Sequence, residues 1–82
     1  MKRHIATISK NKLEEIRVGL DEYKGYDLVS IRVWADPYAG SERVPTKRDI
    51  SIGVRLLPGL IEALQQAEAR ARKAGLLQDE AA

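Results

Sequence analysis

The sequence contains no cysteine and a single histidine, His4. Without cysteine the chain has no disulfide, no thiolate metal site and no thiol nucleophile. One histidine excludes a histidine-based metal cluster, and no hydroxyl has a histidine or cysteine placed to activate it. The adjacent acids Glu14 and Glu15 point to opposite sides of a strand, so a small nuclease is only a distant alternative. We predict a protein that is not an enzyme, with no catalytic residues, no metal and no cofactor.

Long apolar runs are also absent. No stretch approaches the ~20 residues of a membrane span, and the first residues lead into no signal-like apolar segment. We therefore expect no contact with a membrane. The lack of cysteine and of targeting signals favours a reducing interior, hence the cytoplasm, with a place on the nucleoid if the source is a bacterium.

The remaining composition is that of one small globular domain. The chain has 82 residues, of which 44% are hydrophobic and 32% are charged. We expect one domain over residues 1–82, ordered over about 5–74 with flexible ends. A domain of ~60 residues buries only about 60% of the surface of its unfolded chain, so this one is marginal and a homodimer is the simplest remedy. The net charge of +2 is too small to indicate nucleic acid by itself.

The first half of the chain reads as β-strands. Over residues 27–34, Val29, Ile31 and Val33 alternate with Arg32 and Trp34, so the two sets lie on opposite faces of a strand. Residues 15–20 alternate in the same way, and residues 22–26, with a glycine at position 25, form the hairpin between the two strands. Shorter strands are expected over 5–8 and 47–52.

The second half is helical. From residue 57 the apolar residues recur at intervals of three and four, Pro58 suits a first turn, and Gly75 is a suitable stop. The order of elements predicts an α+β fold, in which a four-stranded antiparallel sheet is followed by one C-terminal helix. These apolar residues form a stripe along one side of the helix. A single helix cannot both cover the sheet and bury this apolar stripe, so we expect dimerisation through Leu57, Leu60, Ile61 and Leu64.

Aromatic rings and cations alternate on the other face of the predicted sheet. Arg32 and Trp34 lie opposite the aliphatic side chains, and the hairpin contributes Tyr23, Lys24 and Tyr26. Cations follow the phosphates of a single strand while rings stack on its bases, each stacked base contributing roughly 1–3 kcal/mol. The pattern predicts a binding surface for single-stranded nucleic acid.

Four segments also resemble a known family. They are Glu22-Tyr23-Lys24-Gly25, the strand 28–34, the segment 45–52 and the leucine-rich helix. In this order and spacing they resemble the C-terminal domain of the transcriptional coactivator positive cofactor four, over about residues 14–64. The resemblance implies a dimer of curved four-stranded sheets that meet through their helices, with single-stranded DNA lying across the sheets.

The resemblance also implies roles for individual residues. It assigns nucleic-acid contacts to Tyr23, Lys24, Arg32, Trp34, Lys47 and Arg48. Tyr26 stands where the family often has lysine. The tyrosine replaces the lysine's phosphate contact with a ring that can stack on a base. Asp49 stands where glycine is usual, which brings a carboxylate close to the binding surface.

The function expected from the sequence is binding of single-stranded DNA with little sequence specificity, in the regulation of transcription, with the transcription machinery as a partner. An RNA-binding regulator, a binder of melted duplex and a protein-interaction dimer are the alternatives. Without a role in binding nucleic acid, Trp34 would only cover the core, Arg32 would pair with Glu15 or Asp21, and the basic pair 47–48 would be a solvated turn.

Overall fold

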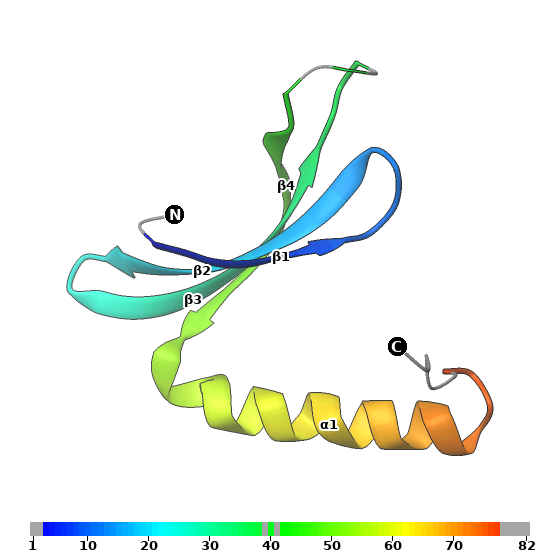
Figure 1. Ribbon diagram of the computed structural model, residues 1–82. Helices are drawn as coiled ribbons and strands as arrows, with labels where there is room; N and C mark the ends of the chain where they lie inside the picture. Colours follow the sequence, from blue (N-terminus) through cyan, green and yellow to red (C-terminus); the bar gives the residue numbers. More distant parts are fainter. Residues whose placement is uncertain (1–2, 39, 41, 78–82) are drawn as a thin grey trace.

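The computed structural model describes residues 3–38, 40 and 42–77, and it has the predicted α+β fold (Figure 1). Four antiparallel strands form one sheet in the order of the chain, and a short 3-10 turn and an α-helix follow. The elements are β1 (Arg3–Ser9), β2 (Glu14–Tyr23), β3 (Tyr26–Ala35), β4 (Val44–Gly53), η1 (Val54–Leu56) and α1 (Leu57–Lys73). The strands are longer than the alternation predicted, because they continue to the ends of their hairpins.

The β2–β3 hairpin is tighter than expected. Only two residues, Lys24 and Gly25, separate the strands, and both have positive φ, at 50° and 84°. Positive φ at both positions is what a two-residue hairpin turn requires. Tyr23 and Tyr26, which the sequence suggested as parts of the turn, instead form the last cross-strand pair of the sheet.

The register gives the sheet two faces of different chemistry. Residues that are directly opposite in neighbouring strands share a face, and successive residues alternate between faces. One side, which we call the charged face, carries Glu15, Arg17, Arg32, Trp34, Asp49 and the pair Tyr23–Tyr26. The other side, the aliphatic face, carries Ile16, Val18, Leu20, Val29, Ile31, Val33, Ile50 and Ile52. This division matches the predicted alternation of the strand 27–34.

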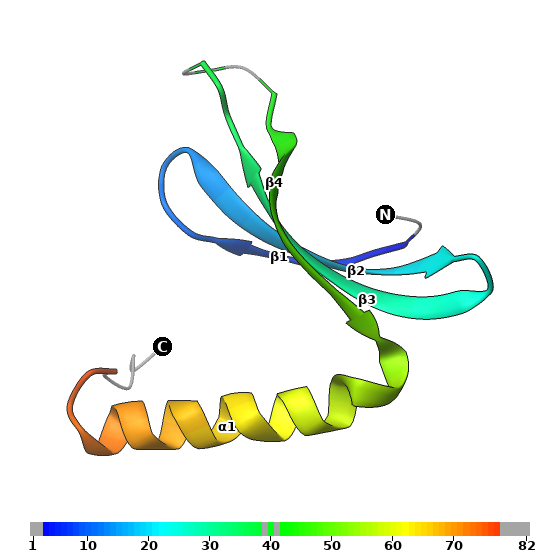
Figure 2. The same cartoon turned by 180° about the vertical axis from the view of Figure 1, so that it is seen from behind.

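Little covers the aliphatic face. Val29 is 2% exposed and is the only buried hydrophobic residue in the described part of the chain, whereas Ile50 is more than half exposed. Helix α1 contacts η1, and η1 contacts β3, but α1 itself makes at most slight contact with the strands. Figure 2 shows α1 running away from the sheet after η1. Within its described residues, one copy of the chain therefore has almost no closed hydrophobic core.

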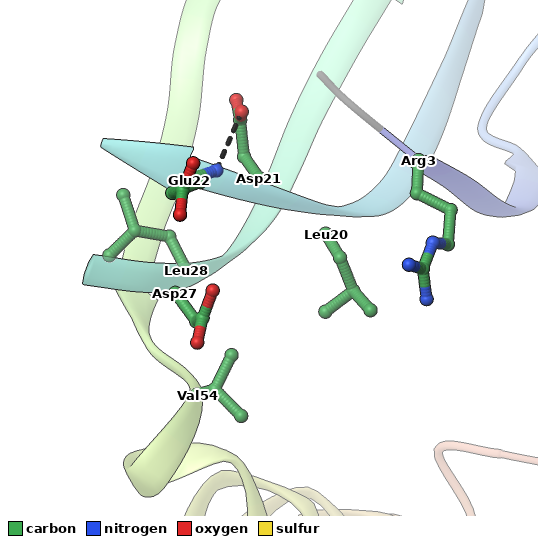
Figure 3. A pocket seen from close by; sticks show the side chains of 7 residues that line it. All are labelled: Arg3, Leu20, Asp21, Glu22, Asp27, Leu28 and Val54. Atoms are coloured by element: carbon green, nitrogen blue, oxygen red, sulfur yellow. Dashed lines mark hydrogen bonds between the residues drawn. The ribbon is translucent and has the colours of Figure 1, made fainter. Parts of the chain in front are cut away.

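The side of the sheet on which the helix leaves is marked by a cavity of about 400 Å³ at the hairpin end (Figure 3). Leu28, which the register places on the charged face, also lines this cavity. Figure 3 shows the Leu20 side chain of the aliphatic face pointing to the side of the sheet on which Val54 of η1 lies, while Asp21 points the opposite way. In the described part of the chain the helix therefore follows on the aliphatic side.

The helix begins and ends as the sequence predicts. Pro58 lies in its first turn, and no residue within the helix is buried. At its end Gly75 has φ of 77°, and the Leu76 amide donates to the Ala71 carbonyl oxygen at 2.8 Å. Residues 78–82, where we expect a flexible end, lie outside the described residues. Among those described, no helix is both long and apolar enough to cross a membrane.

Candidate nucleic-acid interface

Two arginines stand opposite each other at the centre of the charged face. Arg17 of β2 pairs in register with Arg32 of β3, so both guanidinium groups project on the same side of the sheet. Like charges placed directly across a strand pair repel each other. Each arginine has a carboxylate partner in the structure, Glu15 for Arg17 and Asp49 for Arg32. The arrangement concentrates cationic donors where an extended anion could lie along the strands.

Arg32 is held by two contacts to β4. Its Nη1 donates to the Thr46 carbonyl oxygen at 2.8 Å, and its Nη2 donates to Asp49 Oδ2 at 2.7 Å. The sequence suggested Glu15 or Asp21 as alternative ion-pair partners, whereas the structure gives Asp49. The Arg32 side chain is 35% exposed and that of Asp49 is 29% exposed, so solvent reaches both groups.

Trp34 projects on the charged face, as the alternation predicts. It lies opposite Glu15 in the register, and the Arg17 guanidinium carbon is 3.9 Å from its ring centroid, in cation–π contact. The indole is half-buried, and its Nε1 has no hydrogen-bond partner among the residues that the structure describes. One face of the ring is therefore occupied by Arg17, which leaves less of it for stacking on a base than an exposed ring would offer.

Glu15 connects two arginines from different parts of the chain. Arg17 Nε donates to its Oε2 at 2.5 Å, and Arg43 Nη1 donates to its Oε1. Arg43 also donates through Nη2 to the Lys12 carbonyl oxygen at 2.9 Å, which ties the β3–β4 loop to the β1–β2 loop. The hydrogen bonds from Arg17 and then Arg43 lower the pKa of the Glu15 carboxyl below its usual value of 4.5.

A bulge in β4 separates the two residues of the predicted basic pair. The register jumps between the Arg32 and Trp34 pairs, so residues 46–48 lie opposite Val33 alone. Thr46 Oγ1 donates to the Val33 carbonyl oxygen at 2.7 Å and accepts from the Arg48 amide at 3.2 Å. Lys47 is exposed within this bulge.

Arg48 is not brought together with Arg32. Because Asp49 shares the face of Arg32, the preceding residue points to the opposite side of the sheet. The Arg48 guanidinium pairs there with Glu14, which also accepts from Lys10 at 3.0 Å. Lys47 and Arg48 therefore occupy different surroundings, although they are adjacent in the sequence.

The hairpin end of the charged face carries the exposed rings. Tyr23 is 62% exposed and Tyr26 is 71% exposed. Lys24 Nζ lies 5.3 Å from the Tyr23 ring centroid. From Trp34 to Tyr26 the strand extends roughly 25 Å, at about 3.3 Å per residue. The face thus offers cations at its centre and freely accessible aromatic surface at one end.

The sequence reasoning gave no role on this surface to Arg17 or Arg43, and it named Glu15 only as an alternative partner of Arg32. For Arg17 and Glu15 a signal exists, since the two-residue turn at Lys24-Gly25 sets the hairpin register by counting back from Tyr23 and Tyr26. Arg43 comes from a loop, and no local pattern announces its contact with Glu15. Within the described residues no group of three or more histidine, cysteine, aspartate or glutamate side chains is arranged to hold a metal ion.

Comparison with known proteins gives similar structures but no matching family model and no matching curated protein. A PC4 homolog from Burkholderia pseudomallei, in its tetragonal crystal form, is 32% identical, with a TM-score of 0.72 over 80% of this chain and 96% of that chain. The orthorhombic form of the same protein also aligns with a TM-score of 0.72, over 80% of this chain and 88% of that one.

A second similar structure is the bacteriophage T5 homolog of the eukaryotic transcription coactivator PC4, implicated in recombination-dependent DNA replication. It is 24% identical, with a TM-score of 0.65 over 85% of this chain and 80% of that chain, and it shows the shared fold. PC4 is the positive cofactor four that the sequence motifs resemble. With the same sheet and helix, and with nearly a third of its aligned residues shared with the Burkholderia protein, the chain belongs to the family of PC4 homologues.

Proposed function

We propose that this chain binds single-stranded DNA on the charged face of its sheet and carries out no catalysis there. The observation that supports this most directly is the pair Arg17–Arg32, opposed across two strands on a face that continues to the exposed rings of Tyr23 and Tyr26. Cations beside exposed rings are the combination that holds a single strand. A duplex keeps its bases stacked on one another, so it cannot use the rings in this way.

The two parts of the face have separate roles in this proposal. The arginines at the centre, with Lys24 and Lys47 nearer the ends, contact phosphates. The tyrosines stack on bases, and each stacked base contributes roughly 1–3 kcal/mol. Because every base has a ring face and every nucleotide has a phosphate, we expect little sequence specificity. Trp34 positions the Arg17 guanidinium through the cation–π contact and contributes less base stacking than the tyrosines.

We also propose that the functional unit is a homodimer. No residue within α1 is buried, and Ile61 and Leu64 of its apolar stripe are about half exposed. An aliphatic face and an apolar helix left open on the same side of the sheet are a large apolar surface for one soluble chain. A second copy, placed about a two-fold axis through the helix stripe that includes Leu57 and Leu60, would bury this surface and leave both charged faces open.

The name of PC4 describes a transcription coactivator, and the phage relative is implicated in recombination-dependent DNA replication. For this chain we propose a role in regulating DNA-templated transcription through melted DNA. The test is transcription in vitro from a template that contains a melted segment, with and without the protein. A change in transcript yield that disappears when the segment is closed supports this role, and no change contradicts it.

The binding itself is tested by fluorescence anisotropy with a labelled strand of about 20 bases, offered as single-stranded DNA, single-stranded RNA and duplex DNA. The proposal predicts binding to single-stranded DNA well above that to duplex, with affinity falling as salt rises. Equal or absent binding to both forms of DNA contradicts it. Preference for the ribose strand would instead make the protein an RNA-binding regulator.

A matched pair of variants locates the binding surface. Arg32→Ala removes a cation from the charged face, and Lys73→Ala removes one from the outward side of the helix. We expect the first to weaken binding clearly and the second to leave it unchanged. Equal effects of the two changes would mean that the nucleic acid lies elsewhere.

A further inference from the structure

The ion pair between Arg32 and Asp49 lies within the surface to which the proposed function assigns the DNA backbone. We propose that Asp49 competes with the phosphates for Arg32 and thereby determines how strongly binding depends on charge. This inference rests on the proposed function and adds a residue that tunes it. Its basis is one geometric fact: the carboxylate occupies the hydrogen-bonding position at which a phosphate oxygen would accept from Arg32 Nη2, 2.7 Å away.

The two contacts of Arg32 have different consequences. The Thr46 carbonyl oxygen, 2.8 Å from Nη1, is uncharged and fixes the side chain against β4. The Asp49 carboxylate cancels the charge of the guanidinium. Both side chains are about a third exposed, so a phosphate can approach and take over the second contact while the first one stays in place. The guanidinium is thus positioned for an anion, but its charge is already neutralised.

The neighbouring cluster of Glu15, Arg17 and Arg43 holds a carboxylate that a phosphate cannot easily replace. Glu15 is 8% exposed, and Arg17 and Arg43 both donate to it. One carboxylate is shared there by two guanidinium groups, so the cluster retains one net positive charge. At the Arg32 position one guanidinium group faces one carboxylate, and the net charge of the pair is zero. Asp49 is therefore the residue that decides whether the second cationic position on this face is positive.

The salt dependence of binding measures this difference. For single strands the logarithm of the binding constant falls by about 0.7 per phosphate neutralised for each tenfold rise in salt. Removing the Asp49 charge adds one neutralising cation, so the slope should steepen by about 0.7. If the two proteins bind equally near 1 M salt, Asp49→Asn should bind roughly eightfold tighter near 50 mM and about threefold tighter near 200 mM.

The experiment compares the parent, Asp49→Asn and Glu62→Gln, binding the same single-stranded oligonucleotide across this range of salt. Asparagine keeps the shape of the aspartate side chain and still accepts from Arg32, so the fold should survive, and circular dichroism verifies it. Asp49→Ser is the second variant if the first one fails to fold. Glu62→Gln makes the same change in net charge on the outward side of the helix and should behave like the parent.

A double variant separates competition at Arg32 from a general field effect. In the background Arg32→Ala, the change Asp49→Asn should tighten binding and steepen the slope clearly less than in the parent, because only the repulsion between the unpaired carboxylate and the phosphates is left to relieve. An equal gain in that background would contradict the proposed competition. If the parent binds and Asp49→Asn binds identically, only this inference fails. If the parent does not bind single-stranded DNA at all, the proposed function fails, and the inference fails with it.

Discussion

The two faces of the sheet differ in how much one copy of the chain completes them. On the charged face, ion pairs within the chain match the guanidinium groups of Arg17 and Arg32 with carboxylates. On the aliphatic face, Val29 is buried while Ile50 and the helix stripe stay open. The comparison teaches that a single chain can order its charged face while its aliphatic face stays open, and we propose that a second copy closes the open side.

The largest effect should come from placing a charge on the open apolar side. Leu64→Glu puts a carboxylate in the helix stripe, where we propose that two copies meet. The free energy of unfolding of the dimer should fall by at least the roughly 2–5 kcal/mol that removal of a buried leucine costs, because burial of an unpaired charge adds to this cost. Native mass spectrometry should show monomers, and urea unfolding should begin at lower denaturant.

Gln66→Glu is the matched control for this change, since it adds the same charge on the outward side of the helix. The mass of its native assembly and its stability in urea should both stay close to those of the parent. A dimeric Leu64→Glu protein of normal stability would show that this stripe is not where the copies meet.

The next largest effect concerns the rings at the hairpin. Tyr23→Ala removes a ring that we expect to stack on a base, so binding to single-stranded DNA should weaken by roughly 1–3 kcal/mol. Tyr26→Ala should act similarly, whereas Tyr23→Phe keeps the ring and should bind nearly as the parent does. Isothermal titration at fixed salt measures the three affinities. If the phenylalanine variant lost as much as the alanine variant, the hydroxyl group rather than stacking would be responsible.

A smaller effect should appear in the pH dependence of stability. Arg17 and Arg43 lower the pKa of Glu15, so its carboxylate stabilises the folded state above about pH 4.5, and this contribution is lost as the pH falls below that value. In urea unfolding from pH 7 to pH 3, the parent should be more stable than Glu15→Gln at neutral pH. The difference should shrink on the acid side, and one that grew there would contradict the ion-pair assignment.

The smallest effect is expected at the helix surface. Arg72 and Glu68 are four residues apart, and their charged groups are 3.4 Å apart in an exposed position. Such pairs contribute about 0.3–0.5 kcal/mol, so Glu68→Gln should shift stability by no more than this. A thermal melt provides the comparison. A shift several times larger would mean that Glu68 also contributes to contact between copies.

The fold was largely predictable because its signals are local. The alternation of Val29, Ile31 and Val33 determines which side of β3 is aliphatic, and the spacing of leucines defines the helix. The strand ends were placed less well, because the sequence alone does not say that Lys24 takes positive φ and shortens the turn. The open helix stripe agrees with the expectation of a dimer, which stays a prediction.

The site was predictable only in part. Arg32 and Trp34 lie on the face that alternation assigned to them, but the partner of Arg32 depends on the register between β3 and β4. That register contains a bulge stabilised by a hydrogen bond from Thr46 to Val33, which joins residues distant in sequence. Such contacts leave no periodic trace, so neither the Asp49 ion pair nor the separation of Lys47 from Arg48 was foreseen.

The single tryptophan of the chain offers the most direct measurement of the central claim, because Trp34 lies on the charged face beneath Arg17. A strand bound across this face must disturb the contact between guanidinium and indole. Titration with a single-stranded oligonucleotide should therefore change the tryptophan emission to saturation, and added salt should reverse the change, while the matching duplex should produce little change. An emission that is unaffected by a single strand shown to bind, or that responds equally to the duplex, would contradict the proposal that this face is the binding surface.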